Sequence, residues 1–105
     1  MQKLSIYLPT EPTQGPYYVR HALKELSHIA GGASSYACDI QGGWLNQFHV
    51  LVQEPVTVVY TLASEDVVPQ VRTFLQKLAH EAKEALRQDA VLVTVEDVKE
   101  SFLVS

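Results

Sequence analysis

The order of strand-like and helix-like segments constrains this chain more than any single motif. Residues 4–8 alternate apolar and polar side chains, which is the period of a β-strand. Apolar residues then recur at three- and four-residue steps over 19–29, the period of a helix that lies on a sheet. Two further strands, a second such helix over 68–86 and a last strand over 90–95 follow. This β-α-β-β-α-β order predicts an α+β fold, a ferredoxin-like sandwich with strand order 4-1-3-2.

Turn residues predict where these segments begin and end. Pro16 suits the first turn of a helix, and Gly31 with Gly32 ends that helix because glycine accepts the left-handed conformation. Gly42-Gly43 predicts the turn of the central hairpin, and Ser64 is the expected N-cap of the second helix.

The strand pattern leaves one stretch open and suggests an extra strand. Residues 48–53 belong either to the third strand or to a projecting hairpin arm, because Pro55 lacks a donor and predicts a break or bulge. Ala90 to Val95 is apolar on both faces, which predicts a central or doubly covered strand. Glu100 to Val104 predicts a short extra C-terminal strand that pairs with it.

Composition limits the class of protein. The chain has 105 residues and 47% apolar side chains, which predicts one folded domain over 1–105. Its net charge is −4 and its eight Lys and Arg residues are scattered, so nucleic acid is not an expected partner. No apolar run reaches membrane-spanning length and no apolar signal core follows Met1, so we expect no membrane partner and a cytoplasmic location.

The sequence motifs of the common cofactor and hydrolase sites are missing from this chain. Cys38 is the one cysteine, which excludes an intramolecular disulfide and a cysteine-based metal cluster within one chain. The sequence has no phosphate-binding loop, dinucleotide fingerprint, nucleophile elbow or zinc-protease motif. We therefore predict no cofactor and no metal, and whether the chain catalyses a reaction stays open.

The predicted topology gathers polar residues at one edge of the sheet. The end of the first strand, the hairpin turn and the starts of the third and fourth strands meet there. The N-terminus of the first helix opens at the same edge, and its amide donors could receive an anion. The residues placed at this edge are Pro9, Thr10, Gly42, Gly43, Trp44, Glu54 and Gln88. Four of them are candidate ligand-binding residues: Thr10, Trp44, Glu54 and Gln88.

Three of these candidates also have a structural interpretation, which we favour. Glu54 would act as a general base only if burial raised its pKa; otherwise it accepts backbone N–H bonds and fixes the hairpin. Gln88 either orients a ligand or satisfies the end of the second helix. Trp44 is either a stacking platform or a plug that covers a sheet end or a dimer contact.

Three residues at metal-ligand positions share one face of the first helix, namely His21, Glu25 and His28. A metal site there would need a further ligand from another element, such as His49 or His80. We favour a solvated helix face over a metal site.

A series of short motifs carries a resemblance to known proteins. The motifs are Gly31-Gly32-Ala33-Ser34, Gly42-Gly43-Trp44, Glu54-Pro55-Val56-Thr57-Val58-Val59 and Gln88-Asp89-Ala90-Val91. The series, over residues 31–104, resembles a loose group of small bacterial and phage proteins of unassigned function. It is similar, more distantly, to a family of domains with a Gly-Trp hairpin and a Gln-Glu-Ser-Val strand start. Asp89 stands where that family has glutamate, and Ala33-Ser34 where it has an aromatic residue and threonine. The resemblance implies a ferredoxin-like fold, and no particular reaction, cofactor or partner.

Two functions fit these observations. The first is a small, non-catalytic homodimer that binds a protein or a small-molecule partner. Two copies would pack sheet to sheet or through their sheet edges, because Tyr7, Val50, Val59 and Leu92 make a fully solvated second sheet face implausible. The alternative is an enzyme or a regulatory ligand binder that holds a small polar ligand around Glu54, Gln88 and Trp44.

Overall fold

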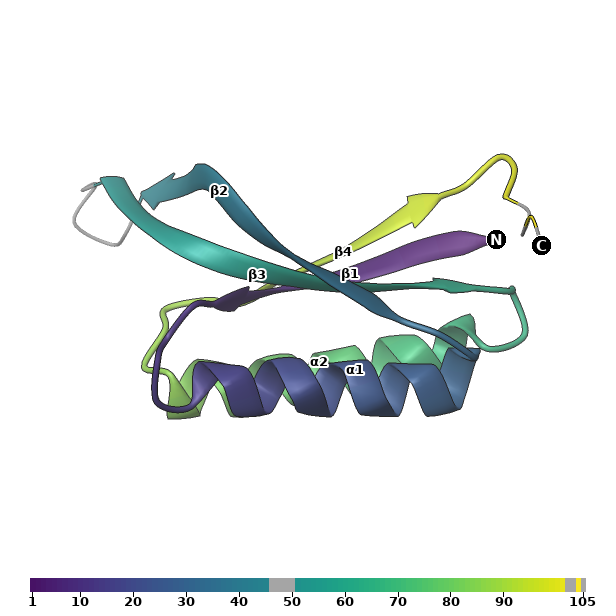
Figure 1. Cartoon of the computed structure of the whole chain (residues 1–105), viewed down its shortest axis with the longest axis horizontal. Coiled ribbons are helices and arrows are strands. Elements are labelled where there is room, and N and C mark those ends of the chain that lie inside the picture. Colours follow the sequence, from purple (N-terminus) through teal and green to yellow (C-terminus); the bar gives the residue numbers. More distant parts are fainter. Residues whose placement is uncertain (46–50, 102–103, 105) are drawn as a thin grey trace.

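The fold is a four-stranded sheet with two helices on one of its faces (Figure 1). The computed structural model describes residues 1–45, 51–101 and 104, and the side chains of 1–37, 55–101 and 104. The elements are β1 (Gln2–Pro9), α1 (Gly15–Ala30), β2 (Ser34–Leu45), β3 (Leu51–Ala63), α2 (Val68–Ala85) and β4 (Leu92–Asp97). The architecture is α+β and ferredoxin-like, as the order of segments predicted.

The sheet has the strand order β2-β3-β1-β4, and every neighbouring pair is antiparallel. The predicted order is therefore confirmed. β1 pairs with β3 on one side and with β4 on the other, so that Ile6 lies between Val59 and Val93. Paired residues in an antiparallel sheet share a face, so this register decides which side chains meet.

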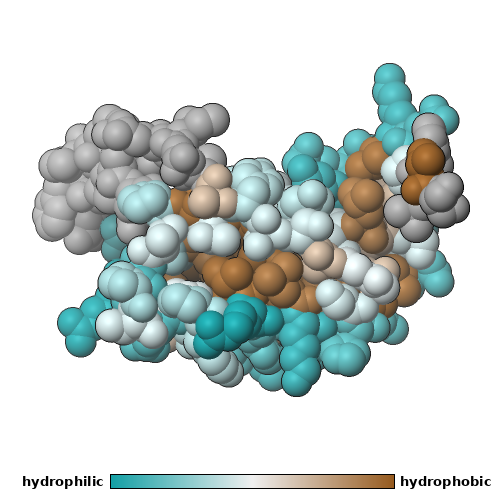
Figure 2. Space-filling model, in the orientation of Figure 1, coloured by the Kyte–Doolittle hydropathy of each residue, from teal (hydrophilic) through white to brown (hydrophobic). Residues whose placement is uncertain are grey.

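The hydrophobic core lies between the sheet and the two helices. Leu4, Ile6 and Leu8 of β1 are fully buried, which confirms the period-two pattern. The predicted stripe of α2 is buried as well, at Val68, Val71, Leu75, Leu78, Ala82 and Leu86. Figure 2 shows the apolar residues along the seam between sheet and helices, with hydrophilic residues over the outer side of the helices.

The central hairpin is longer than the turn residues predicted. Gly42 and Gly43 do not form its turn; they lie within β2 and pair with Glu54 and Gln53. The strands continue to the pair Leu45 and Leu51, and the connection between them is outside the described residues. Cross-strand pairing overrode the local turn preference of the two glycines, because β3 continues alongside them.

Pro55 marks an irregularity in this hairpin, as predicted. The register shifts between Cys38 and Gly42, where β2 carries more residues than the facing part of β3. Pro55 stands opposite this bulge, where its missing N–H breaks no ladder bond. Residues 51–53 belong to β3, which settles part of the open stretch, while 48–50 lie outside the described residues.

The end of the chain differs from the prediction in two ways. β4 begins at Leu92 and is an edge strand, neither central nor doubly covered. The extra strand expected over 100–104 is absent from its described residues 100, 101 and 104, while 102 and 103 are outside the described part. The Val98 N–H bonds to the Met1 carbonyl at 3.0 Å, which continues the register of β4 with β1 by one residue beyond Asp97.

The helix boundaries confirm the predicted end of α1 and show that the predicted N-cap of α2 was wrong. Gly31 has φ +90° and its N–H bonds to the Ser27 carbonyl, so α1 ends as predicted. Ser64 is not the N-cap of α2; Val67 occupies that position. The Ser64 carbonyl accepts the N–H groups of Val67 and Val68, and its hydroxyl bonds to Asp66. Neither described helix is long and apolar enough to cross a bilayer.

Candidate functional site

The structure ties the end of β1 to the strand that carries Glu54. The Thr10 N–H donates to the Pro55 carbonyl at 3.0 Å, and the Thr10 and Thr57 hydroxyl oxygens are 3.4 Å apart. Thr10 and Glu54 are thus held near each other by the backbone.

Trp44 lies farther out on the hairpin. Its backbone pairs with Val52, four residues before Val56, where the pairing of β1 with β3 ends. At ~3.3 Å per residue this is about 13 Å along the strand. The side chains of Trp44 and Glu54 are outside the described set, so their predicted roles stay predictions.

Gln88 takes part in the end of α2. Its N–H bonds to the Lys83 carbonyl at 2.9 Å and the Arg87 N–H to the Glu84 carbonyl at 3.3 Å, which is the Schellman pattern. The Gln88 side-chain amide donates to the Leu86 carbonyl at 3.0 Å. This is the helix-terminating role that we favoured for Gln88, and it occupies one of the two N–H groups of the amide.

The left-handed residue in this motif is Arg87, with φ +54°. A side chain in that conformation costs about 1–2 kcal/mol, and glycine avoids the cost. We expect Arg87→Gly to raise the free energy of unfolding by about 0.5–1 kcal/mol, after its larger unfolded-state entropy is subtracted. Urea denaturation measures this, and Arg87→Ala is the control because it keeps the Cβ. Equal stability of the two variants would contradict the conformational explanation.

The amide donors at the start of α1 are already used within the chain. The Glu11 carboxylate accepts hydrogen bonds from the N–H groups of Thr13 and Gln14 and from the Thr13 hydroxyl. The Gly15 N–H bonds to the Glu11 carbonyl, and the Tyr17 and Tyr18 N–H groups bond to the Gln14 carbonyl. Pro16 has no N–H. Across residues 13–18 every backbone donor therefore has an internal acceptor, which leaves none for the anion considered from the sequence.

These bonds lower the pKa of Glu11, chiefly through the Thr13 hydroxyl and then through the two backbone N–H groups. A lowered folded-state pKa adds stability above the ordinary value of 4.5, and this stability is lost as pH falls through the folded-state pKa. We expect Glu11→Gln to melt at a lower temperature than the parent at neutral pH. The difference should shrink below pH 4.5, as followed by thermal melts across pH. A constant difference would contradict the assignment.

The three helix residues considered for metal binding do not form a metal site with described neighbours. No group of three or more His, Cys, Asp or Glu residues suited to an ion occurs in the searched part of the chain. His21 instead stacks on Tyr17, with ring centroids 5.8 Å apart, and lies 5.8 Å from Phe74 of α2. His21 therefore packs between the helices.

The sheet face turned away from the helices carries a cluster of tyrosines. By register, Tyr36, Val58, Tyr7 and Leu92 form one row across the four strands. The next row is Ser34, Tyr60, Ser5 and Thr94, and beyond it lie Leu62, Lys3 and Glu96. We call these residues the open face.

Contacts within the open face join its aromatic rings. The Tyr36 and Tyr60 rings meet edge to face at 6.0 Å, and the Lys3 Nζ lies 4.6 Å from the centre of the Tyr60 ring. Tyr36 is 45% exposed, Leu62 39% and Leu92 57%, so this apolar surface reaches solvent.

The sequence identified part of the open face. Tyr7 and Leu92 lie on it, but Val59 faces the helices and is fully buried, because it pairs with Ile6. Val50 is outside the described residues. Tyr60 was missed, although the period-two alternation that placed Tyr7 would have placed it once the register was known.

Comparison with known proteins supports the fold. No family model and no curated protein sequence matches the chain. Among solved structures, a phage SAM lyase in complex with S-methyl-5'-thioadenosine superposes with TM-score 0.59 and 20% identity, over 91% of this chain and 80% of that one. CutA from Synechococcus elongatus superposes with TM-score 0.64 and 12% identity, over 90% of this chain and 72% of that one. At sequence identities this low, the similarity supports a shared fold and no shared function.

Proposed function

We propose that this protein is a small, non-catalytic homodimeric interaction module, in which a second copy covers the open face. The observation that carries the proposal is the apolar and aromatic surface opposite the helices, where Tyr36, Leu62 and Leu92 are exposed; Val58, in the same row as Tyr36, is itself fully buried. Tyrosines are enriched at protein interfaces because they combine a large apolar ring with a polar end.

The charge pattern of the open face favours a second copy over a partner of one charge sign. Among the open-face residues whose side chains the structure describes, Lys3 and Glu96 are the charged ones, and they pair in one row. A surface with balanced charge and otherwise neutral side chains can pack against an identical surface without like-charge contacts. An acidic or basic partner would find no complementary field there.

Solution mass tests the proposal. Light scattering during size exclusion at micromolar concentration is expected to give twice 11.7 kDa. The mass of a single chain at that concentration would overturn it.

A second candidate function is a ligand site at the sheet edge, and the bond from Thr10 to the carbonyl beside Glu54 favours it. The related phage SAM lyase fold was solved with S-methyl-5'-thioadenosine, which makes this nucleoside a suitable probe. If Glu54 binds it, Glu54→Gln should keep the melting temperature and abolish the calorimetric binding signal. A large drop in melting temperature would instead assign Glu54 to the scaffold, and no binding by the parent would remove the candidate.

A further inference from the structure

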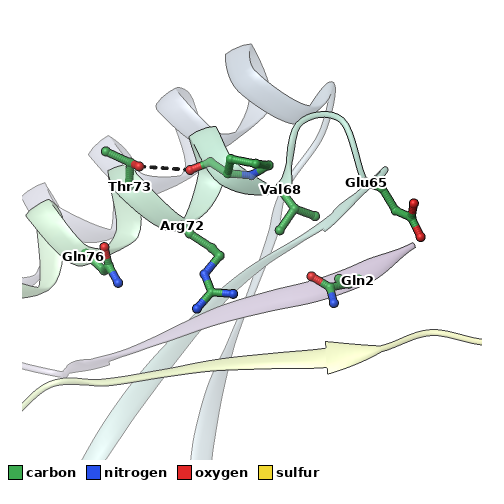
Figure 3. Close-up of a pocket in the computed structure, with 7 residues that line it drawn as sticks. Gln2, Glu65, Val68, Arg72, Thr73 and Gln76 are labelled. Atoms are coloured by element: carbon green, nitrogen blue, oxygen red, sulfur yellow. Dashed lines mark hydrogen bonds between the residues drawn. The ribbon is translucent and has the colours of Figure 1, made fainter.

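A hollow lies on the helix side of the sheet, away from the open face. It measures about 450 Å³ and is lined by Gln2, Glu65, Val68, Pro69, Arg72, Thr73 and Gln76. Figure 3 shows that α2 and the turn before it form one wall, while Gln2 reaches in from the start of β1. The volume is in the range of small-molecule sites.

The two charged groups of this hollow stand at opposite ends. In Figure 3, the Gln2 side chain lies between the Arg72 guanidinium and the Glu65 carboxylate. Arg72 is four residues beyond Val68, or about 6 Å along the helix axis, whereas Glu65 precedes the helix. The hollow is therefore neutral overall but has a positive end and a negative end.

Polar groups lie between the charges. The Gln2 amide nitrogen donates to Asp97 at 3.0 Å, and in Figure 3 the Gln2 carbonyl oxygen lies on the side of the amide that faces Arg72. The Thr73 hydroxyl donates to the Pro69 carbonyl at 3.0 Å, which leaves donation at the other end to Arg72 and Gln76. Val68, 8% exposed, and Pro69 supply an apolar surface between the ends.

We infer that this hollow binds a small extended zwitterion, such as an ω-amino acid or a short peptide with both ends charged. The carboxylate of the ligand meets Arg72 and Gln76, and its ammonium group meets Glu65. The charges of an α-amino acid sit on adjacent carbon atoms, too close together to reach both ends. A ligand with one charge leaves either Arg72 or Glu65 without a partner.

The experiment is a titration of the full-length, ¹⁵N-labelled protein followed by amide chemical shifts. The probes are 6-aminohexanoate, hexanoate, hexylammonium and glycine, which separate the two charges and their spacing. We expect 6-aminohexanoate to bind up to about fivefold more tightly than the other three, as one exposed ion pair would give. The shifts should map to Gln2 and residues 65–76.

Two variants test the two charged ends of the hollow separately. Arg72→Gln should reduce 6-aminohexanoate to the affinity of hexylammonium, and Glu65→Gln to that of hexanoate. Arg20→Gln and Glu81→Gln, which change exposed charges outside the hollow, should leave binding unchanged. Equal binding of hexanoate and 6-aminohexanoate, shifts that map elsewhere, or no shift would each overturn the inference. The open face takes no part in this site, so the result is independent of the dimer.

Discussion

Replacing Tyr36 with lysine is expected to turn the dimer into a monomer. Tyr36 is 45% exposed on the open face and packs against Tyr60 at 6.0 Å. In a dimer formed through this face, the new ammonium group would be buried without a partner, which costs about 3 kcal/mol or more. Each copy carries the substitution, so the dissociation constant should rise by at least about 100-fold, as measured by sedimentation equilibrium.

The control for this variant is Tyr17→Lys. Tyr17 is 55% exposed on α1, on the helix side of the sheet, so the same substitution there should leave the dimer intact. Dissociation by both variants would point to an effect of net charge, and an intact Tyr36→Lys dimer would show that the partner copy uses another surface.

Replacing Leu75 with alanine is expected to cause the largest loss of stability among single substitutions considered. Leu75 is fully buried in the stripe of α2 that packs on the sheet. Truncation removes apolar contacts and leaves a cavity, which lowers the free energy of unfolding by about 2–5 kcal/mol. Small domains have only about 5–15 kcal/mol in total, so a partly unfolded protein at 37 °C is a realistic outcome.

Urea denaturation at one fixed protein concentration measures this loss, because dimerisation makes stability depend on concentration. Lys77→Ala, at an exposed position of the same helix, should change the free energy by less than about 0.5 kcal/mol. A loss below about 1 kcal/mol for Leu75→Ala would contradict the packing assigned to α2.

Residue periodicity and turn residues correctly predicted β1, the two helices and the end of α1, because these features depend on neighbouring residues. The alternation of Leu4, Ile6 and Leu8 identified the central strand, since side chains on a strand point to opposite faces in turn. The helical stripes identified α1 and α2 for the equivalent reason. Gly31 marked a helix end because the left-handed conformation costs glycine little.

Local patterns misled where pairing at long range decides the outcome. Gly42-Gly43 is a strong turn signal, yet both glycines lie in β2 because β3 continues alongside them. The C-terminal stretch is apolar and β-prone, yet its described residues 100, 101 and 104 form no strand. No sequence motif marks Arg72 and Glu65 as parts of one site. They line the same hollow only in the folded chain, where Gln2 from β1 lies between them.

The sequence by itself determined the order of the elements, the two buried helix faces and the absence of familiar catalytic motifs. These follow from residue periodicity and residue chemistry, which are local. Only the tertiary structure decided the row that joins Tyr36, Val58, Tyr7 and Leu92, the internal use of the donors before α1 and the hollow beside α2. Each of these depends on the register between strands and on contacts between distant segments, which the packing of the whole core sets.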